Sequence, residues 1–167
     1  MKLIGTIALC LLAALQTNRV DAAGMGRVLE FGLLVPESVP YDNKPHEHTR
    51  TVVGYPRVAL ATNQVPAKLG SLFGFHFEIN GLPYANGNLL LVTITRVHPT
   101  FTLPDGKRSN GGSVVYRLPI SRGRADGWAT QRLDHNYQLL PGKWHYELKV
   151  LGSTLLEQTF DVVAPKR

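Results

Sequence analysis

Residues 143–150 alternate without exception between polar and apolar side chains, and this pattern constrains the fold more than any other feature of the chain. The apolar members are Trp144, Tyr146, Leu148 and Val150. Because successive side chains on a β-strand point to opposite faces, the pattern predicts a strand with one buried and one solvated face. Residues 72–79 repeat the pattern with three phenylalanines and an isoleucine. Two such strands predict a layered β-sheet protein, with Trp144 as a core residue.

Short runs of the same kind recur along the chain, separated by Gly, Pro and Asn. We predict the other strands at 27–35, 49–53, 57–62, 89–97, 114–120, 128–133 and 155–163. The turn signals between strands include Gly54-Tyr55-Pro56, His98-Pro99 and Pro104-Asp105-Gly106. No segment shows a sustained helical period with caps at both ends. We therefore predict an all-β fold, a single immunoglobulin-like antiparallel β-sandwich of about seven to nine strands.

The hairpin between 143–150 and 155–163 poses a register problem. Gly152-Ser153 is typical of a two-residue hairpin turn. With that turn, the carboxylates of Glu157 and Asp161 would point into the core. Burying them costs more than one additional loop residue, so we predict a longer loop or a β-bulge in this hairpin.

The first 22 residues have the layout of a secretory signal peptide. Lys2 gives a positive start, residues 3–15 are apolar and uncharged, and Val20-Asp21-Ala22 places small residues at the two cleavage positions. The apolar run is too short to serve comfortably as a permanent membrane anchor. Cys10 lies inside the run, whereas a lipoprotein would carry its cysteine directly after it. We expect cleavage after Ala22.

Cleavage would leave one domain, residues 23–167, with an ordered core at about 27–163. This mature chain has no cysteine, which excludes disulfides, thiol nucleophiles and thiolate zinc sites. No later segment approaches the ~20 apolar residues of a membrane-spanning helix. We expect a soluble monomer in the periplasm, with secretion from the cell as the alternative.

The charge pattern bears on the partners that the protein can bind. The formal net charge of the full sequence is +6, but its basic residues are scattered and no basic run interleaved with aromatics is present. Nucleic acid is therefore not an expected partner, and export argues against it as well. The expected partner is a protein or polymer of the cell envelope.

Two strands share an aromatic-His-aromatic-Glu pattern: Phe75-His76-Phe77-Glu78 and Trp144-His145-Tyr146-Glu147. In each strand the His and the Glu lie two residues apart, on the solvated face. If the strands are neighbours in one sheet, two imidazoles and two carboxylates would converge, a donor set suited to zinc or copper. The candidate metal ligands are His76, Glu78, His145 and Glu147. The simpler interpretation is that these polar residues only fill outward positions.

Motifs of nucleophilic and metal-dependent catalysis are not found. The sequence has no Gly-x-Ser-x-Gly elbow, no His-Glu-x-x-His helix and no phosphate-binding Gly-rich loop before a helix, and it implies no cofactor. His46-Glu47-His48 is a second potential metal clip, but it follows a Pro-rich stretch that gives poor preorganisation. An enzyme, for example a hydrolase of an envelope polymer, would need residues gathered from distant loops.

Several short stretches, in their order along the chain, resemble a known family. They are Val65-Pro66-Ala67-Lys68-Leu69-Gly70, Phe73-Gly74-Phe75, His98-Pro99, Leu140-Pro141-Gly142-Lys143-Trp144 and Leu156-Glu157-Gln158-Thr159-Phe160-Asp161-Val162. The chain is similar in these stretches to an uncharacterised bacterial family of small exported domains, a domain of unknown function. The resemblance spans roughly 27–163 and implies an exported sandwich domain, with no functional residues to carry over.

Together these observations favour an exported, non-catalytic β-sandwich that serves as a binding or accessory module. The alternative function is metal binding or metal delivery through the outward His and Glu residues.

Overall fold

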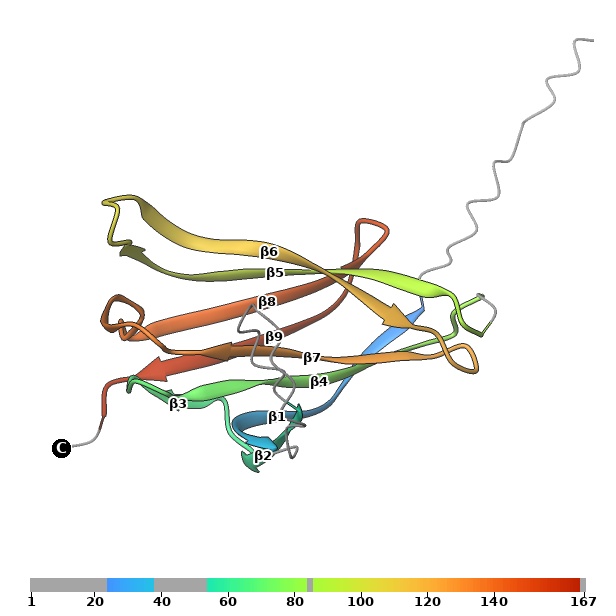
Figure 1. Ribbon diagram of the computed structural model, residues 1–167, viewed down its shortest axis with the longest axis horizontal. Helices are drawn as coiled ribbons and strands as arrows, with labels where there is room; N and C mark the ends of the chain where they lie inside the picture. Colours follow the sequence, from blue (N-terminus) through green and yellow to red (C-terminus); the bar gives the residue numbers. More distant parts are fainter. Residues whose placement is uncertain (1–23, 38–53, 84–85, 166–167) are drawn as a thin grey trace, which may run out of the picture.

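The computed structural model describes residues 24–37, 54–83 and 86–165. The predicted signal peptide, the predicted strand at 49–53 and His46-Glu47-His48 lie outside these residues. The described residues form nine strands in two sheets that pack face to face (Figure 1). The predicted all-β sandwich is confirmed.

The first sheet has four strands in the order β2-β1-β4-β7. Their bounds are β2 Gly54–Leu60, β1 Met25–Glu37, β4 Leu72–Asn80 and β7 Ala125–Arg132. The second sheet has five strands in the order β3-β9-β8-β5-β6. Their bounds are β3 Gln64–Pro66, β9 Ser153–Val163, β8 Gly142–Val150, β5 Leu89–Thr102 and β6 Arg108–Pro119. All neighbouring strands are antiparallel except β3 and β9.

Helical structure is minor in the part of the chain that the structure describes. It consists of one 3₁₀ turn, η1, at Asn136–Gln138. None of the helical segments there has the length and hydrophobicity that crossing a bilayer requires.

The core lies between β4 of the first sheet and β8 and β9 of the second. The Phe73 ring meets the Trp144 ring edge-on at a centroid distance of 5.8 Å, and Phe75 meets Tyr146 in the same way at 5.7 Å. Phe160 of β9 lies 5.1 Å from Phe73. Edge-to-face aromatic pairs add to the stabilisation from burial. Trp144 is 1% exposed, which confirms it as a core residue.

Two strands extend beyond their predicted ends, because a β-strand tolerates proline and glycine at particular positions. Strand β5 continues through His98-Pro99 to Thr102, with a register shift between Val97 and Phe101. Gly54-Tyr55-Pro56 lies within β2, which is an edge strand. Proline has no N–H to donate to a sheet, so it is tolerated at bulges and on edge strands, where that hydrogen bond is not needed. Strand β6 also begins earlier than predicted, because its glycine-rich start pairs with β5.

The β8–β9 hairpin contains the predicted bulge. Leu148 pairs with Leu156, whereas the next residue, Lys149, pairs with Thr154. Val150 pairs with Ser153, so the turn is Leu151-Gly152 and not the predicted Gly152-Ser153. Both turn residues have positive φ (50° and 85°). Positive φ at both central positions is the requirement of the turn that matches strand twist. The bulge keeps the carboxylates of Glu157 and Asp161 on β9 out of the core.

Candidate functional site

The two His/Glu pairs predicted from the sequence lie on opposite outer faces of the sandwich. His76 and Glu78 belong to β4 of the first sheet, and His145 and Glu147 belong to β8 of the second. The aromatic sides of β4 and β8 face each other across the core, so the polar sides point away from each other. The condition for a four-residue site, that the two strands neighbour each other in one sheet, is not met. The four side chains do not converge.

On β4, the carboxylate of Glu78 is occupied by donors of this chain. The Nδ2 of Asn80 and the Nε of Arg27 each donate a hydrogen bond of 2.9 Å to its Oε1. The Nη1 of Arg124 lies 3.8 Å from its Oε2. The hydrogen bonds from Asn80 and Arg27 hold the pKa of Glu78 below its usual value. A metal ion would have to displace these donors.

His76 is likewise engaged by its neighbours. Its ring stacks on the Trp128 ring at a centroid distance of 4.8 Å. Its Nε2 lies 3.3 Å from Asp126 Oδ2, and its Nδ1 lies 3.7 Å from Glu30 Oε1. The pair on β4 therefore belongs to a set of surface ion pairs and a ring stack.

On β8, His145 has a different environment. Its Nδ1 lies 2.9 Å from Thr159 Oγ1 on β9, within hydrogen-bond distance. Its Nε2 lies 3.7 Å from Glu157 Oε2 and 4.0 Å from Glu147 Oε1. One ligand atom from each of His145, Glu147 and Glu157 lies within 4.8 Å of the other two. We call these three residues the β8–β9 cluster.

The two carboxylates of the β8–β9 cluster create a negative charge that a cation would stabilise. Glu147 and Glu157 are direct cross-strand partners, and like charges in that position repel. Lys149 reduces the repulsion, because its Nζ lies 2.5 Å from Glu147 Oε2. The hydrogen bond and charge of Lys149 hold the pKa of Glu147 below its usual value. This arrangement leaves Glu157 and the Nε2 of His145 facing each other.

Sequence reasoning missed Glu157 as a member of this cluster. The signal was present, because Glu157 had to point outward once a bulge was predicted in the hairpin. The partner of Glu157 across the strands, however, depends on where the bulge lies. Only the pairing of Leu148 with Leu156 places Glu157 opposite Glu147.

Strand β6 forms one edge of the five-stranded sheet and pairs with β5 alone among the described strands. Between residues 107 and 124, which include all of β6 and the turn after it, the sequence has five basic residues and no acidic one. They are Lys107, Arg108, Arg117, Arg122 and Arg124. Exposed apolar side chains lie beside them on the outer face: Leu89 and Leu91 of β5 and Val115 of β6. We call this edge, with its basic residues, the β6 edge.

Comparisons with known proteins bear on the family and the fold. Residues 24–162 match a family model described as a domain of unknown function, DUF3859. No curated protein matches the sequence. Among solved structures, an immunoglobulin-like protein from Pseudomonas aeruginosa is 22% identical, with a TM-score of 0.58 over 85% of this chain and 99% of that chain.

A second solved structure is an alkylpurine DNA glycosylase from Pseudomonas fluorescens bound to DNA containing an abasic site analogue. It is 17% identical with a TM-score of 0.40, over 60% of this chain and 27% of that chain. The first structure shares the immunoglobulin-like fold of the sandwich described above. The family match covers nearly all of the described residues. The chain belongs to the DUF3859 family.

Proposed function

We propose that this protein is an exported, non-catalytic immunoglobulin-like domain that binds an extended, acidic segment of a partner protein along the β6 edge. The observation that carries the proposal is the edge itself: a 12-residue strand, open on one side among the described strands, with five basic residues between 107 and 124 and no acidic one in that stretch. An open edge offers backbone donors and acceptors to an added strand.

The edges of the two sheets differ in how well they are protected. Natural sheets protect edges with short strands, prolines, bulges or charges. Strand β3 has three residues, and β2 contains Pro56 and two register irregularities with β1. The middle of β6, Ser113 to Tyr116, has none of these features. The β6 edge is therefore suited to strand addition.

Charge determines the chemistry of the partner. Within the described residues, Arg108, Arg117 and Arg122 have no ion-pair partner on this chain. On an added strand with alternating acidic and apolar residues, the carboxylates would lie on the outer face, where Arg117 points, and the apolar side chains would lie on the inner side beside Tyr116 and Leu118. Such complementarity steers association and weakens as salt rises.

The binding test uses two defined probes, an octapeptide of alternating Val and Glu and the same peptide with Lys in place of Glu. Fluorescence anisotropy should detect binding of the Glu peptide alone, and Arg117→Glu should weaken it about tenfold, as the loss of a charge-assisted contact does. Arg57→Glu on β2 is the matched control, because it makes the same charge change on another edge and should leave binding unchanged. Equal binding of both peptides, or of neither, contradicts the proposal.

A photo-cross-linking residue placed at position 115 would identify the natural partner. The full chain in its native cell should give an adduct from position 115 and none from position 140, an exposed site in the loop before β8. An adduct of twice the protein's mass would mean that the edge pairs with a second copy, which contradicts an acidic partner. An adduct with nucleic acid contradicts it too.

Export has its own test. The support for it is the pattern of the first 22 residues, with a positive start, an apolar run and small residues at the cleavage positions. N-terminal sequencing of protein recovered from outside the cytoplasm should begin at Ala23. Recovery from the cytoplasm with Met1 intact would contradict export and leave the binding proposal standing.

The β8–β9 cluster favours a second candidate function, the binding of zinc or copper. Two ligands held ~2.0–2.2 Å from one ion in tetrahedral geometry lie about 3.5 Å apart, close to the distances from His145 Nε2 to the two carboxylates. The Thr159 hydroxyl at Nδ1 orients the ring so that Nε2 faces Glu147 and Glu157.

Titration calorimetry with zinc and with copper tests this second function. Glu157→Gln should weaken binding at least tenfold, because it removes one of three ligands. His76→Ala is the control, since His76 lies on the opposite face. Binding that survives Glu157→Gln and His145→Ala rules out the cluster as a metal site.

A further inference from the structure

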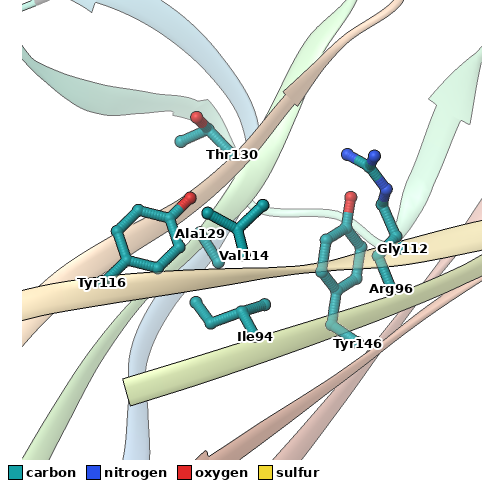
Figure 2. Close-up of a pocket in the computed structure, with 8 residues that line it drawn as sticks. All are labelled: Ile94, Arg96, Gly112, Val114, Tyr116, Ala129, Thr130 and Tyr146. Carbon is teal, nitrogen blue, oxygen red and sulfur yellow. The ribbon is translucent and has the colours of Figure 1, made fainter. Parts of the chain in front are cut away.

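A small cavity lies between the two sheets, where the edge strands β6 and β7 approach each other (Figure 2). Its volume is about 30 Å³. Its polar lining consists of Arg96, Tyr116, Thr130 and Tyr146. A single ordered water needs ~10–15 Å³ of such volume, so the cavity has room for about two water-sized groups.

Arg96 breaks the apolar pattern of β5 inside the sandwich. It follows Val92 and Ile94 on the inward side of the strand and pairs with Tyr146 of β8. One guanidinium nitrogen, Nη1, donates to the side-chain oxygen of Gln131, and the guanidinium carbon lies 5.7 Å from the centroid of the Trp144 ring.

Part of the hydrogen-bonding capacity of this guanidinium is unused. The Nε of Arg96 is buried and has no hydrogen-bond partner, and within residues 24–37, 54–83 and 86–165 no carboxylate forms an ion pair with Arg96. A charge this close to the core is costly unless an acceptor compensates it.

The tyrosine hydroxyls point to the same kind of ligand. Tyr146 is 2% exposed, and its buried hydroxyl lies close to the guanidinium of Arg96 without a hydrogen bond of good geometry. Figure 2 shows Tyr116 and Tyr146 on either side of Ile94 and Val114, with their hydroxyls pointing in the same direction and the guanidinium of Arg96 beside the Tyr146 hydroxyl. Burial raises the pKa of both tyrosines, against the opposing charge of Arg96, so both hydroxyls remain protonated donors at neutral pH.

We propose that this cavity is a binding site for a carboxylate group. Its donors are a guanidinium with an unused N–H and a buried hydroxyl, and its lining contains no acidic residue. Arginine binds the two oxygens of a carboxylate in a planar fork, and a neighbouring hydroxyl donor strengthens the contact. The volume has room for the two oxygens of a carboxylate. The site does not depend on a partner at the β6 edge.

The carboxylate can come from a small free acid or from the end of a polypeptide. We would titrate the protein with acetate at constant ionic strength, balanced with chloride, and follow the backbone amide resonances of Gly112 and Thr130. A saturable shift is expected, and Arg96→Met should weaken the binding of acetate at least tenfold. Tyr146→Phe should weaken it severalfold. A shift that stays linear with acetate, or that Arg96→Met leaves unchanged, means that the cavity holds only water and overturns the proposal.

A second variant closes the cavity without removing a donor. Gly112 lies opposite Arg96 on β6, and a Cβ added there would meet no atom within 4 Å. Gly112→Leu should therefore fold and fill the cavity entrance, abolishing the acetate shift. Ser113→Leu is its matched control, because the next residue on a strand points to the outer face. Retained acetate binding in Gly112→Leu also overturns the proposal, even if Arg96→Met fails to fold.

Two peptide ligands then distinguish the sources of the carboxylate. One is trialanine with a free carboxyl terminus, and the other is trialanine amide. Tighter binding of trialanine than of acetate assigns the site to a polypeptide terminus, and tighter binding of acetate assigns it to a small acid. Equal binding of trialanine and its amide would show that the carboxylate is not recognised and would overturn the proposal.

Discussion

Strands β4 and β8 have the same sequence pattern and different surroundings. Each places aromatic rings in the core, three on β4 and two on β8, and a His and a Glu on an outer face. On β4, Arg27 and Asn80 occupy the carboxylate of Glu78. On β8, the neighbouring strand brings a second carboxylate, Glu157, toward His145. The pattern of a strand thus determines which face a residue occupies, and the neighbouring strands determine its chemistry.

Removing an inward-facing aromatic ring from either strand should cause a similar loss of stability, and this loss is the largest effect that we expect. Phe75→Ala and Trp144→Ala each remove a buried ring and should lower the free energy of unfolding by about 3–5 kcal/mol. Trp128→Ala on β7 should cost less, because Trp128 stacks on His76 at the outer face. Urea unfolding measures all three variants. A difference of more than ~3 kcal/mol between the two core variants would break the equivalence of the strands.

The outward halves should differ in their response to zinc. Lys149 competes with a metal for Glu147, so Lys149→Met should raise the zinc affinity of the β8–β9 cluster about tenfold, equivalent to ~1.4 kcal/mol. Arg27→Met frees Glu78 in the same way, but among the described residues Glu78 belongs to no group of three ligand atoms like the β8–β9 cluster. Calorimetry on both variants provides the comparison. An equal gain from Arg27→Met would show that neighbouring strands do not determine the difference.

The sequence predicted the shared features of β4 and β8 because alternation is a local property. The buried rings, the outward His and Glu and the bulge in the last hairpin all follow from parity and from the cost of burying charge. Which strands neighbour each other is a long-range property. The assignment of His76 and His145 to opposite faces therefore required the sheet order.

The candidate sites were harder to predict for the same reason. Glu157 joins His145 only through the register set by the bulge. Arg96 is one inward position in a strand that reads as nearly continuous apolar sequence, and its meeting with Tyr146 depends on the pairing of β5 with β8. The end of β5 was missed because His98-Pro99 is a common turn signal, whereas here the His98 ring stacks on Phe101 inside the sandwich.

His98 gives the stability of the fold a pH dependence. It is 6% exposed, and burial lowers its pKa. The unfolded chain binds a proton near the ordinary histidine pKa of about 6.5, so below that pH the unfolded state binds more protons than the folded state. The stability contribution of neutral His98 is therefore complete above about pH 6.5 and declines as the pH falls toward the lowered pKa.

Replacement of His98 tests this dependence. His98→Phe keeps a ring against Phe101 and Trp144 and should flatten the decline of unfolding free energy between about pH 7 and about pH 5.5. His135→Phe is the control, because it makes the same replacement at an exposed position. An unchanged slope in His98→Phe would mean that other groups cause the acid sensitivity.

The smallest effects should appear in the titration of the two outward glutamates. Both have a lowered pKa in the folded protein, so their ion pairs stabilise the fold above the ordinary glutamate pKa and lose that effect as the pH falls through the lowered one. Arg27→Met should raise the pKa of Glu78 and leave Glu147 unchanged, whereas Lys149→Met should do the reverse. Carboxyl carbon chemical shifts followed by NMR give each pKa separately. Glu78 should respond less to its single substitution than Glu147 does, because Asn80 and Arg124 remain beside it whereas Lys149 is the main donor to Glu147.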